Sequence, residues 1–159
     1  MKIAVVGTGM IAREALIALR QVKNVEVVTV CARPHSREKA QALAQEFGVP
    51  QVATDYGAML AAHEADFVYL GIVNSAHFDY ARQAIEAGWH VIVEKPFAST
   101  LAETEELIAR ARAAHCYLFE AVTPLFLPNY FGILEALPRL GLIRMVQANF
   151  SQYSSRYER

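Results

Sequence analysis

Two adjacent charged residues, Glu94 and Lys95, directly follow a short apolar run at residues 89–93. In open α/β sheets, ligands bind at the carboxyl ends of the strands, so this position would face a crevice. A lysine ammonium there can stabilise negative charge that develops on a reacting oxygen. We therefore expect Lys95 to be catalytic, with Glu94 beside it. The simpler alternative is a solvent-exposed lysine at the end of a strand.

A glycine-rich segment near the N-terminus, Gly7-Thr8-Gly9-Met10-Ile11-Ala12, fits the pattern GxGxxA. It follows an apolar run at residues 3–6 and opens a stretch with helical spacing, which is the context that phosphate binding requires. Gly7 allows the tight turn, Gly9 lets a pyrophosphate approach the backbone, and Ala12 permits close helix packing. We expect residues 7–11 to contact a dinucleotide. A glycine turn without a ligand is the alternative.

The choice between NAD and NADP depends on the residues that follow the second apolar run, residues 25–31. An NAD site usually has Asp or Glu there, bound to the ribose 2′-OH. This sequence has Ala32 followed by Arg33. Since an arginine can pair with a 2′-phosphate, Arg33 favours NADP slightly, although it can also stack on the adenine of either cofactor.

Short apolar runs alternate with amphipathic stretches along most of the chain, which indicates repeated βαβ units. We expect strands at residues 3–6, 25–31, 49–53, 67–72, 89–93 and 116–119, with helices at 10–20, 36–47, 55–62, 75–87, 100–114 and 128–137. This pattern predicts an α/β fold: a doubly wound, Rossmann-type, mostly parallel sheet in the order 3-2-1-4-5-6.

The C-terminal segment has a different pattern. Within residues 143–153, Val146, Ala148 and Phe150 alternate with polar residues. This period of two predicts a half-buried antiparallel strand. We expect a dinucleotide-binding domain at residues 1–122. Residues 123–159 would form a helix and the first strand of an incomplete α+β domain for substrate binding or oligomerisation.

Composition excludes several classes of protein. The 159 residues are 54% hydrophobic, and their net charge of −1 argues against a nucleic-acid partner. The longest run without a charge, residues 121–134, contains two prolines and is shorter than the roughly 20 residues that a membrane span needs. Cysteine and histidine spacing suggests no metal site. With no signal peptide recognised, we expect a cytoplasmic protein.

Three segments carry a resemblance to a known family: GTGMIA at residues 7–12, VYLGIVNSAH at 68–77 and EKPF at 94–97. They resemble the glucose–fructose oxidoreductase, inositol dehydrogenase and rhizopine-catabolism (Gfo/Idh/MocA) family over residues 2 to about 153. The resemblance implies NAD(P)-dependent hydride transfer to or from sugars, polyols or diols. Complete members are expected to be homo-oligomers.

The same resemblance implies roles for individual residues. Lys95 matches the lysine that faces the reacting oxygen, and Glu94 matches a contact to the nicotinamide ribose. The other cofactor-binding positions that it implies are Val73, Asn74, His77, Pro96 and Glu120. Val73 departs from the proline that the family commonly has. For His77 an equally weighted alternative is a first-turn helix histidine that bonds only to the backbone.

The family's catalytic base resembles a histidine with a nearby aspartate in a second domain, and residues 128–159 contain neither. We therefore expect the cofactor-binding part of a longer enzyme, with little turnover of its own, as a monomer or a strand-swapped dimer. One alternative is a non-catalytic dinucleotide sensor that regulates a partner. Another is a Rossmann-like domain that binds no nucleotide.

Overall fold

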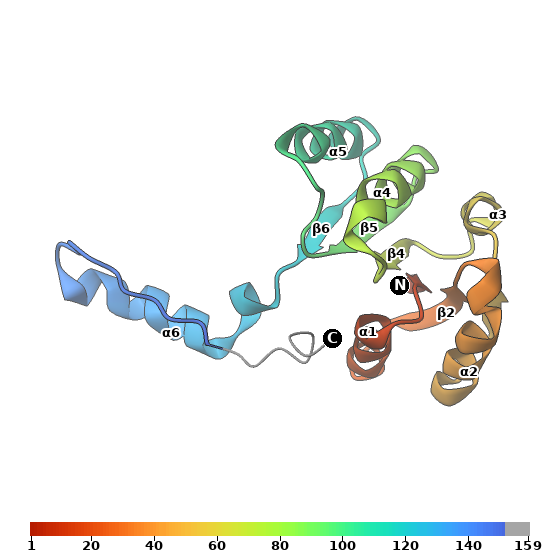
Figure 1. Cartoon of the computed structure of the whole chain (residues 1–159), viewed down its shortest axis with the longest axis horizontal. Coiled ribbons are helices and arrows are strands. Elements are labelled where there is room, and N and C mark those ends of the chain that lie inside the picture. The colour runs from red at the N-terminus through yellow and green to blue at the C-terminus, as the bar shows by residue number, and fades with distance from the viewer. Residues whose placement is uncertain (152–159) are drawn as a thin grey trace. The chain divides into compact units, whose positions relative to one another are not determined.

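The computed structural model describes residues 1–151 (Figure 1). The chain divides into a compact unit, Met1–Val122, and a second unit that begins at Thr123.

The first unit is built on a six-stranded parallel sheet. Its strands are β1 (Lys2–Val6), β2 (Glu26–Cys31), β3 (Gln51–Ala53), β4 (Phe67–Leu70), β5 (His90–Glu94) and β6 (Leu118–Ala121). They lie in the order β3-β2-β1-β4-β5-β6, and every neighbouring pair is parallel. The predicted α/β fold and strand order are confirmed. The carboxyl ends of β1 and β4 therefore lie side by side where the strand order reverses, which is the usual place for a ligand.

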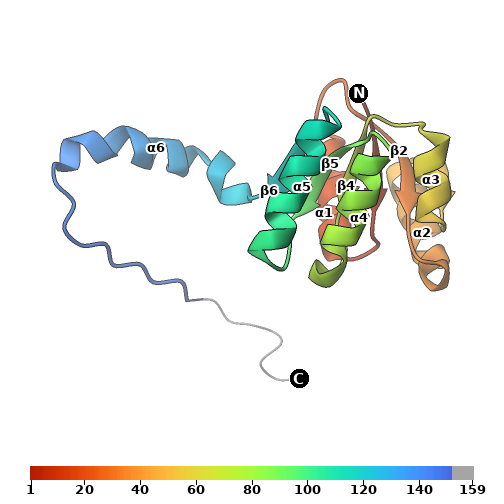
Figure 2. The same cartoon turned by 90° about the horizontal axis from the view of Figure 1, so that it is seen from above.

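Helices cover both faces of this sheet (Figure 2). Helices α1 (Met10–Leu19) and α2 (Arg37–Phe47) pack on one face through a cluster that includes Leu16 and Leu43. Helices α3 (Tyr56–Ala62), α4 (His77–Glu86) and α5 (Leu101–Ala113) pack on the other through a cluster that includes Ile85 and Leu107. Because both faces are buried, the central strands are apolar throughout rather than alternating.

Local signals in the sequence set the ends of several helices. Gly48 adopts φ +69° and ends α2, as expected of a residue without a Cβ. The Asp55 carboxylate accepts a hydrogen bond from the backbone N–H of Ala58 and caps α3. Thr100 and Glu103 form a capping box at the start of α5. These caps hold the loops at both edges of the sheet in defined positions.

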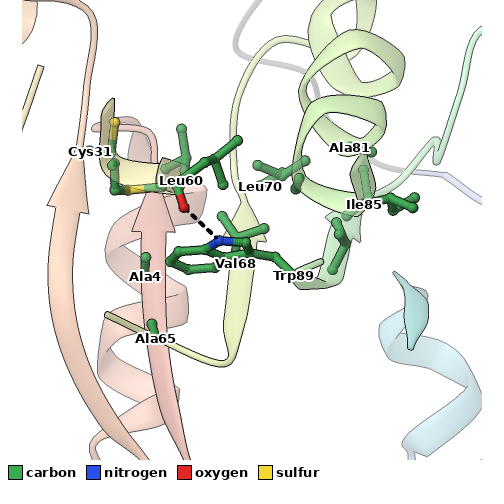
Figure 3. Packing of buried hydrophobic residues seen from close by; sticks show 14 of the residues in the cluster. Ala4, Cys31, Leu60, Ala65, Val68, Leu70, Ala81, Ile85 and Trp89 are labelled. Atoms are coloured by element: carbon green, nitrogen blue, oxygen red, sulfur yellow. Dashed lines mark hydrogen bonds between the residues drawn. The ribbon is translucent and has the colours of Figure 1, made fainter. Parts of the chain in front are cut away.

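Trp89, directly before β5, is the largest fully buried side chain among the described residues (Figure 3). Its indole Nε1–H donates to the Leu60 carbonyl of α3 at 3.1 Å. The ring also belongs to the cluster formed with Ala81 and Ile85 of α4. Trp89 therefore ties β5, which leads to Glu94 and Lys95, to two of the three helices on this face.

The second unit contains α6 (Pro128–Ala136), which begins at a proline as predicted. The predicted strand at residues 143–153 is wrong for its described part. Residues 143–151 form no strand, and Val146 and Phe150 are 80% and 90% exposed. The alternating pattern favours a strand only when a neighbouring strand supplies hydrogen bonds and a covered face. Residues 152 and 153 of that prediction lie outside the described residues.

Among residues 1–151, no helix combines the length and the apolar character that crossing a bilayer would require.

Candidate functional site

A cavity of about 590 Å³ opens at the carboxyl edge of the sheet. Its walls come from the glycine loop, the segment after β2, two residues after β3, the segment after β4 and the first turns of α4. The lining residues are Val6, Gly7, Thr8, Gly9, Ile11, Cys31, Ala32, Arg33, Pro34, Ser36, Thr54, Tyr56, Gly71, Ile72, Val73, Ala76 and Tyr80. Six of the predicted cofactor contacts line it: Gly7, Thr8, Gly9, Ile11, Arg33 and Val73.

Gly7 is required by the protein's own packing. It adopts φ +124°, and a Cβ at this position would lie 2.2 Å from the carbonyl oxygen of Gly71. The backbone is held there by two hydrogen bonds, from Gly7 N to the Cys31 carbonyl and from Gly71 N to the Val6 carbonyl, both 2.9 Å. The end of β1 is therefore wedged between β2 and β4, and only glycine fits.

Gly9 is different, because no neighbour among residues 1–151 requires it to be glycine. Its φ of −80° and ψ of 178° suit any residue, and a Cβ built there meets no atom within 4 Å. Gly9 is the N-cap of α1, which has no side-chain cap and no acidic residue in its first turn. Free N–H groups and the positive end of a helix dipole therefore face the cavity. A methyl group would fill this cradle, so the geometry fits a bound pyrophosphate.

The charge of the cavity also fits an anion. Of the lining residues, Arg33 is the one with a full charge, and none is acidic. Ala32 occupies the position where an NAD site usually has a carboxylate. The nearest carboxylate along the chain from β3, Asp55, is engaged in capping α3. The described wall is therefore neutral or positive throughout.

Sequence reasoning missed four polar residues that line the cavity: Ser36, Thr54, Tyr56 and Tyr80. The rings of Tyr56 and Tyr80 lie with their centroids 4.5 Å apart, and the Tyr56 hydroxyl donates to the Tyr80 carbonyl at 2.9 Å. Burial is the main cause of a raised pKa for Tyr56, which keeps this hydroxyl protonated. Thr54 and Tyr56 follow β3, so the strand-end rule could have found them. Tyr80 had no local signal.

Burial also raises the pKa of the Cys31 thiol to about 11, with a smaller contribution from Asp55. Cys31 ends β2, is 2% exposed and lines the cavity. Because its thiol stays protonated near neutral pH, it acts as a small apolar wall residue rather than a nucleophile.

The turn that contains Glu94, Lys95 and Pro96 does not line this cavity. It follows β5, the strand next to β4 on the side away from β1. Glu94 is half-buried and accepts a 2.5 Å hydrogen bond from the Tyr69 hydroxyl, whereas Lys95 is exposed. Lys95, predicted to be catalytic, and Glu94, predicted to contact the cofactor, are therefore at the carboxyl edge of the sheet, beyond the cavity that the glycine loop forms.

The other predicted contacts lie around this turn or outside the cavity. His77 is fully buried, and its ring nitrogens lie 2.7 Å from the Pro96 carbonyl and 3.2 Å from the Ile72 carbonyl. A Glu120 carboxylate oxygen accepts a hydrogen bond from Phe97 N at 2.9 Å. Neither His77, Glu120, Asn74 nor Met10 lines the cavity, and the Met10 side chain is 81% exposed. Within residues 1–151, no three His, Cys, Asp or Glu side chains gather into a metal site.

Comparison with known proteins agrees with this geometry. Residues 1–122 match the family model Gfo/Idh/MocA, described as "Oxidoreductase family, NAD-binding Rossmann fold". The chain is 39% identical over 158 residues to the uncharacterized oxidoreductase YgjR of Escherichia coli strain K12, covering 99% of this chain and 48% of that protein. It is 34% identical over 157 residues to scyllo-inositol 2-dehydrogenase (NADP(+)) IolU of Bacillus subtilis strain 168, covering 99% and 47%.

A solved structure with the same fold is KijD10, a 3-ketoreductase from Actinomadura kijaniata, in complex with TDP-benzene and NADP. It superposes with a TM-score of 0.81 at 28% identity, over 87% of this chain and 43% of that one. The chain spans about half the length of the curated relatives that it matches. By its sequence match over residues 1–122 and by its sheet, the chain belongs to the Gfo/Idh/MocA oxidoreductase family and carries that family's NAD-binding Rossmann fold.

Proposed function

We propose that this chain is the cofactor-binding part of an oxidoreductase that transfers hydride between NADP or NAD and a hydroxyl-bearing carbon of a sugar, polyol or diol. The observation that carries the proposal is the cradle at Gly9, where an uncapped helix N-terminus faces a cavity whose described wall has no acidic residue. The relative from Bacillus subtilis, whose name describes an inositol dehydrogenase, supports the substrate class.

The residues divide into two groups along the carboxyl edge of the sheet. The backbone of residues 7–11 would hold the pyrophosphate, with Arg33 near the adenosine ribose and Val73 on the opposite wall. A bound nicotinamide dinucleotide would supply the hydride donor or acceptor. Arg33 together with the missing carboxylate at Ala32 supports a slight preference for NADP.

Lys95 is the residue that we assign to the chemistry. Its side chain is exposed directly after β5, and the preceding residue, Glu94, is half-buried. When an alcohol is oxidised, negative charge develops on its oxygen as the proton leaves, and a cation held beside that oxygen lowers the barrier. Lys95 would contact the reacting oxygen, while Glu94 would hold the ribose next to the nicotinamide. Asn74 would lie near that same ribose.

The decisive experiment compares Lys95→Met with the unchanged sequence in the complete protein. We expect kcat to fall by about a hundredfold or more, the size of effect seen when one charge-stabilising donor is lost. The Kd for the dinucleotide should stay within about threefold, a small change in free energy. An unchanged kcat would overturn the catalytic role of Lys95. It would favour a protein that binds the dinucleotide without using it in chemistry.

A further inference from the structure

The turn after β5 is held from both sides by side chains that belong to the β4–α4 segment. Tyr69 of β4 bonds to Glu94, the residue before Lys95, through its hydroxyl at 2.5 Å. His77 of α4 contacts the carbonyl of Pro96, the residue after Lys95, at 2.7 Å. Lys95 is thus flanked by two anchored residues while its own side chain stays exposed.

The Tyr69 contact is partly buried, and the tyrosine itself is buried. Tyr69 is 7% exposed and lies opposite Ile92 in the pairing of β4 with β5, two residues before Glu94. The backbone of Gly71 leaves room for the ring, because a Cβ there would lie 3.0 Å from Tyr69 Cε1. Burial and the hydrogen bond to Glu94 raise the pKa of Tyr69, so the hydroxyl remains a donor. A hydrogen bond to a carboxylate is among the stronger kinds in proteins.

The His77 contact joins two loops. Its other ring nitrogen lies 3.2 Å from the carbonyl of Ile72, which lines the dinucleotide cavity, and the ring has no exposed surface. The imidazole therefore lies between the loop after β4 and the turn after β5. It has no access to a ligand, so the second of its two expected roles, bonding to the backbone, is the one that its position supports.

We propose that Tyr69 and His77 are positioning residues that hold the Glu94–Lys95–Pro96 turn in register with the cofactor cavity. The proposal rests on the proposed function. Tyr69 acts through the Glu94 carboxylate, and His77 acts through the Pro96 carbonyl. Neither touches the ligand. Their effect is therefore confined to the nicotinamide half of a bound dinucleotide, because the adenosine half lies against the glycine loop and Arg33.

Comparing the affinity for a whole dinucleotide with the affinity for its adenosine half tests whether the effect is confined to the nicotinamide half. We would determine Kd for NADPH and NADH, and for their adenosine halves 2′,5′-ADP and ADP, with the unchanged chain and with Tyr69→Phe. Loss of the hydroxyl should weaken binding of the preferred dinucleotide by about tenfold, the size expected for one hydrogen bond to a charged group. Binding of its adenosine half should change by less than about twofold.

The matched control is Thr29→Val. Thr29 is 4% exposed and its hydroxyl donates to Gln51 at 3.1 Å, away from both the cavity and the turn. It loses one hydrogen bond of a buried residue, as Tyr69→Phe does, and should leave all four Kd values unchanged. Equal weakening of the dinucleotide and its adenosine half by Tyr69→Phe would show a general structural role and overturn the proposal.

A double-mutant cycle tests whether Tyr69 acts through Glu94. Adding Tyr69→Phe to Glu94→Ala should weaken binding no further than Glu94→Ala alone, whereas additive losses would overturn the proposal.

His77→Asn should likewise weaken binding of the dinucleotide but not binding of its adenosine half. If that buried variant does not fold, Tyr69→Phe alone decides. Failure of the unchanged chain to bind either dinucleotide would refute the proposed function itself. Normal dinucleotide binding by Tyr69→Phe would instead refute only the positioning role of Tyr69.

Discussion

Gly7→Ala should lower the stability of the protein, whereas Gly9→Ala should lower its affinity for a dinucleotide, although both replace a glycine of the same loop with alanine. At Gly7 the new methyl group would lie 2.2 Å from the Gly71 carbonyl oxygen, closer than packed atoms come, and φ would remain at +124°. Overpacking costs about 1–3 kcal/mol and a strained backbone conformation costs another 1–3 kcal/mol. We expect Gly7→Ala to lower the free energy of unfolding by about 2–6 kcal/mol.

At Gly9 the methyl group would enter open space within the cavity wall, and the backbone already suits alanine. Alanine is a poorer N-cap than glycine, but it also reduces the entropy of the unfolded chain. These effects oppose each other, so stability should change by less than about 1 kcal/mol. Affinity for a dinucleotide should fall by about tenfold or more, since the methyl group occupies the place of a phosphate.

The assay combines urea unfolding, which reports stability, with titration of NADPH and NADH followed by fluorescence. The account predicts a lower midpoint for Gly7→Ala and a normal midpoint with weak binding for Gly9→Ala. Two results would refute the reasoning. One is normal dinucleotide affinity in Gly9→Ala. The other is a Gly7→Ala protein as stable as the unchanged chain, which would mean that the loop does not have the packing described.

Three further substitutions test other parts of the account. Arg33→Ala should weaken NADPH binding by about tenfold more than NADH binding, because one charge-assisted contact to a phosphate is lost, and equal losses would contradict the NADP preference. Cys31 has a pKa raised from 9.0 to about 11, so its neutral form adds stability that is complete below pH 9 and is lost as pH rises to about 11. Cys31→Ala should therefore remove roughly 2 kcal/mol of the fall in unfolding free energy between those pH values, compared with Cys116→Ala, because the pKa of the Cys116 thiol is raised less. Trp89→Phe should cost about 2–4 kcal/mol in urea unfolding, since it leaves a void and removes one of the two hydrogen bonds that the Leu60 carbonyl accepts, and a cost below 1 kcal/mol would contradict that packing.

Much of the fold could be predicted because the signals are local. Apolar runs bounded by glycine or polar residues mark the six strands, and Gly48, Asp55 and Thr100 mark helix ends within one or two residues. The strand order follows from the handedness of βαβ units, which holds across folds. The strand expected at residues 143–153 is absent from its described part, residues 143–151, because strand formation depends on a partner and an alternating sequence does not supply one.

In the site, too, the residues marked by a local motif could be predicted, whereas those placed by tertiary packing could not. The glycine loop and Arg33 are found by sequence because a short motif places them, and both line the cavity. Tyr80 was missed because its position depends on how α4 packs. The role of His77 could not be decided, since its partner, the Pro96 carbonyl, lies 19 residues along the chain and meets it only through the pairing of β4 with β5.

The central claim, that the cavity at the carboxyl ends of β1, β2 and β4 binds a nicotinamide dinucleotide, is tested most directly by calorimetric titration of the 159-residue chain with NADPH and NADH. The account predicts saturable binding of at least one dinucleotide at one site per chain, with a Kd in about the micromolar range. It also predicts that Gly9→Ala abolishes most of that binding. A folded chain that shows no saturable heat with either dinucleotide would contradict the claim.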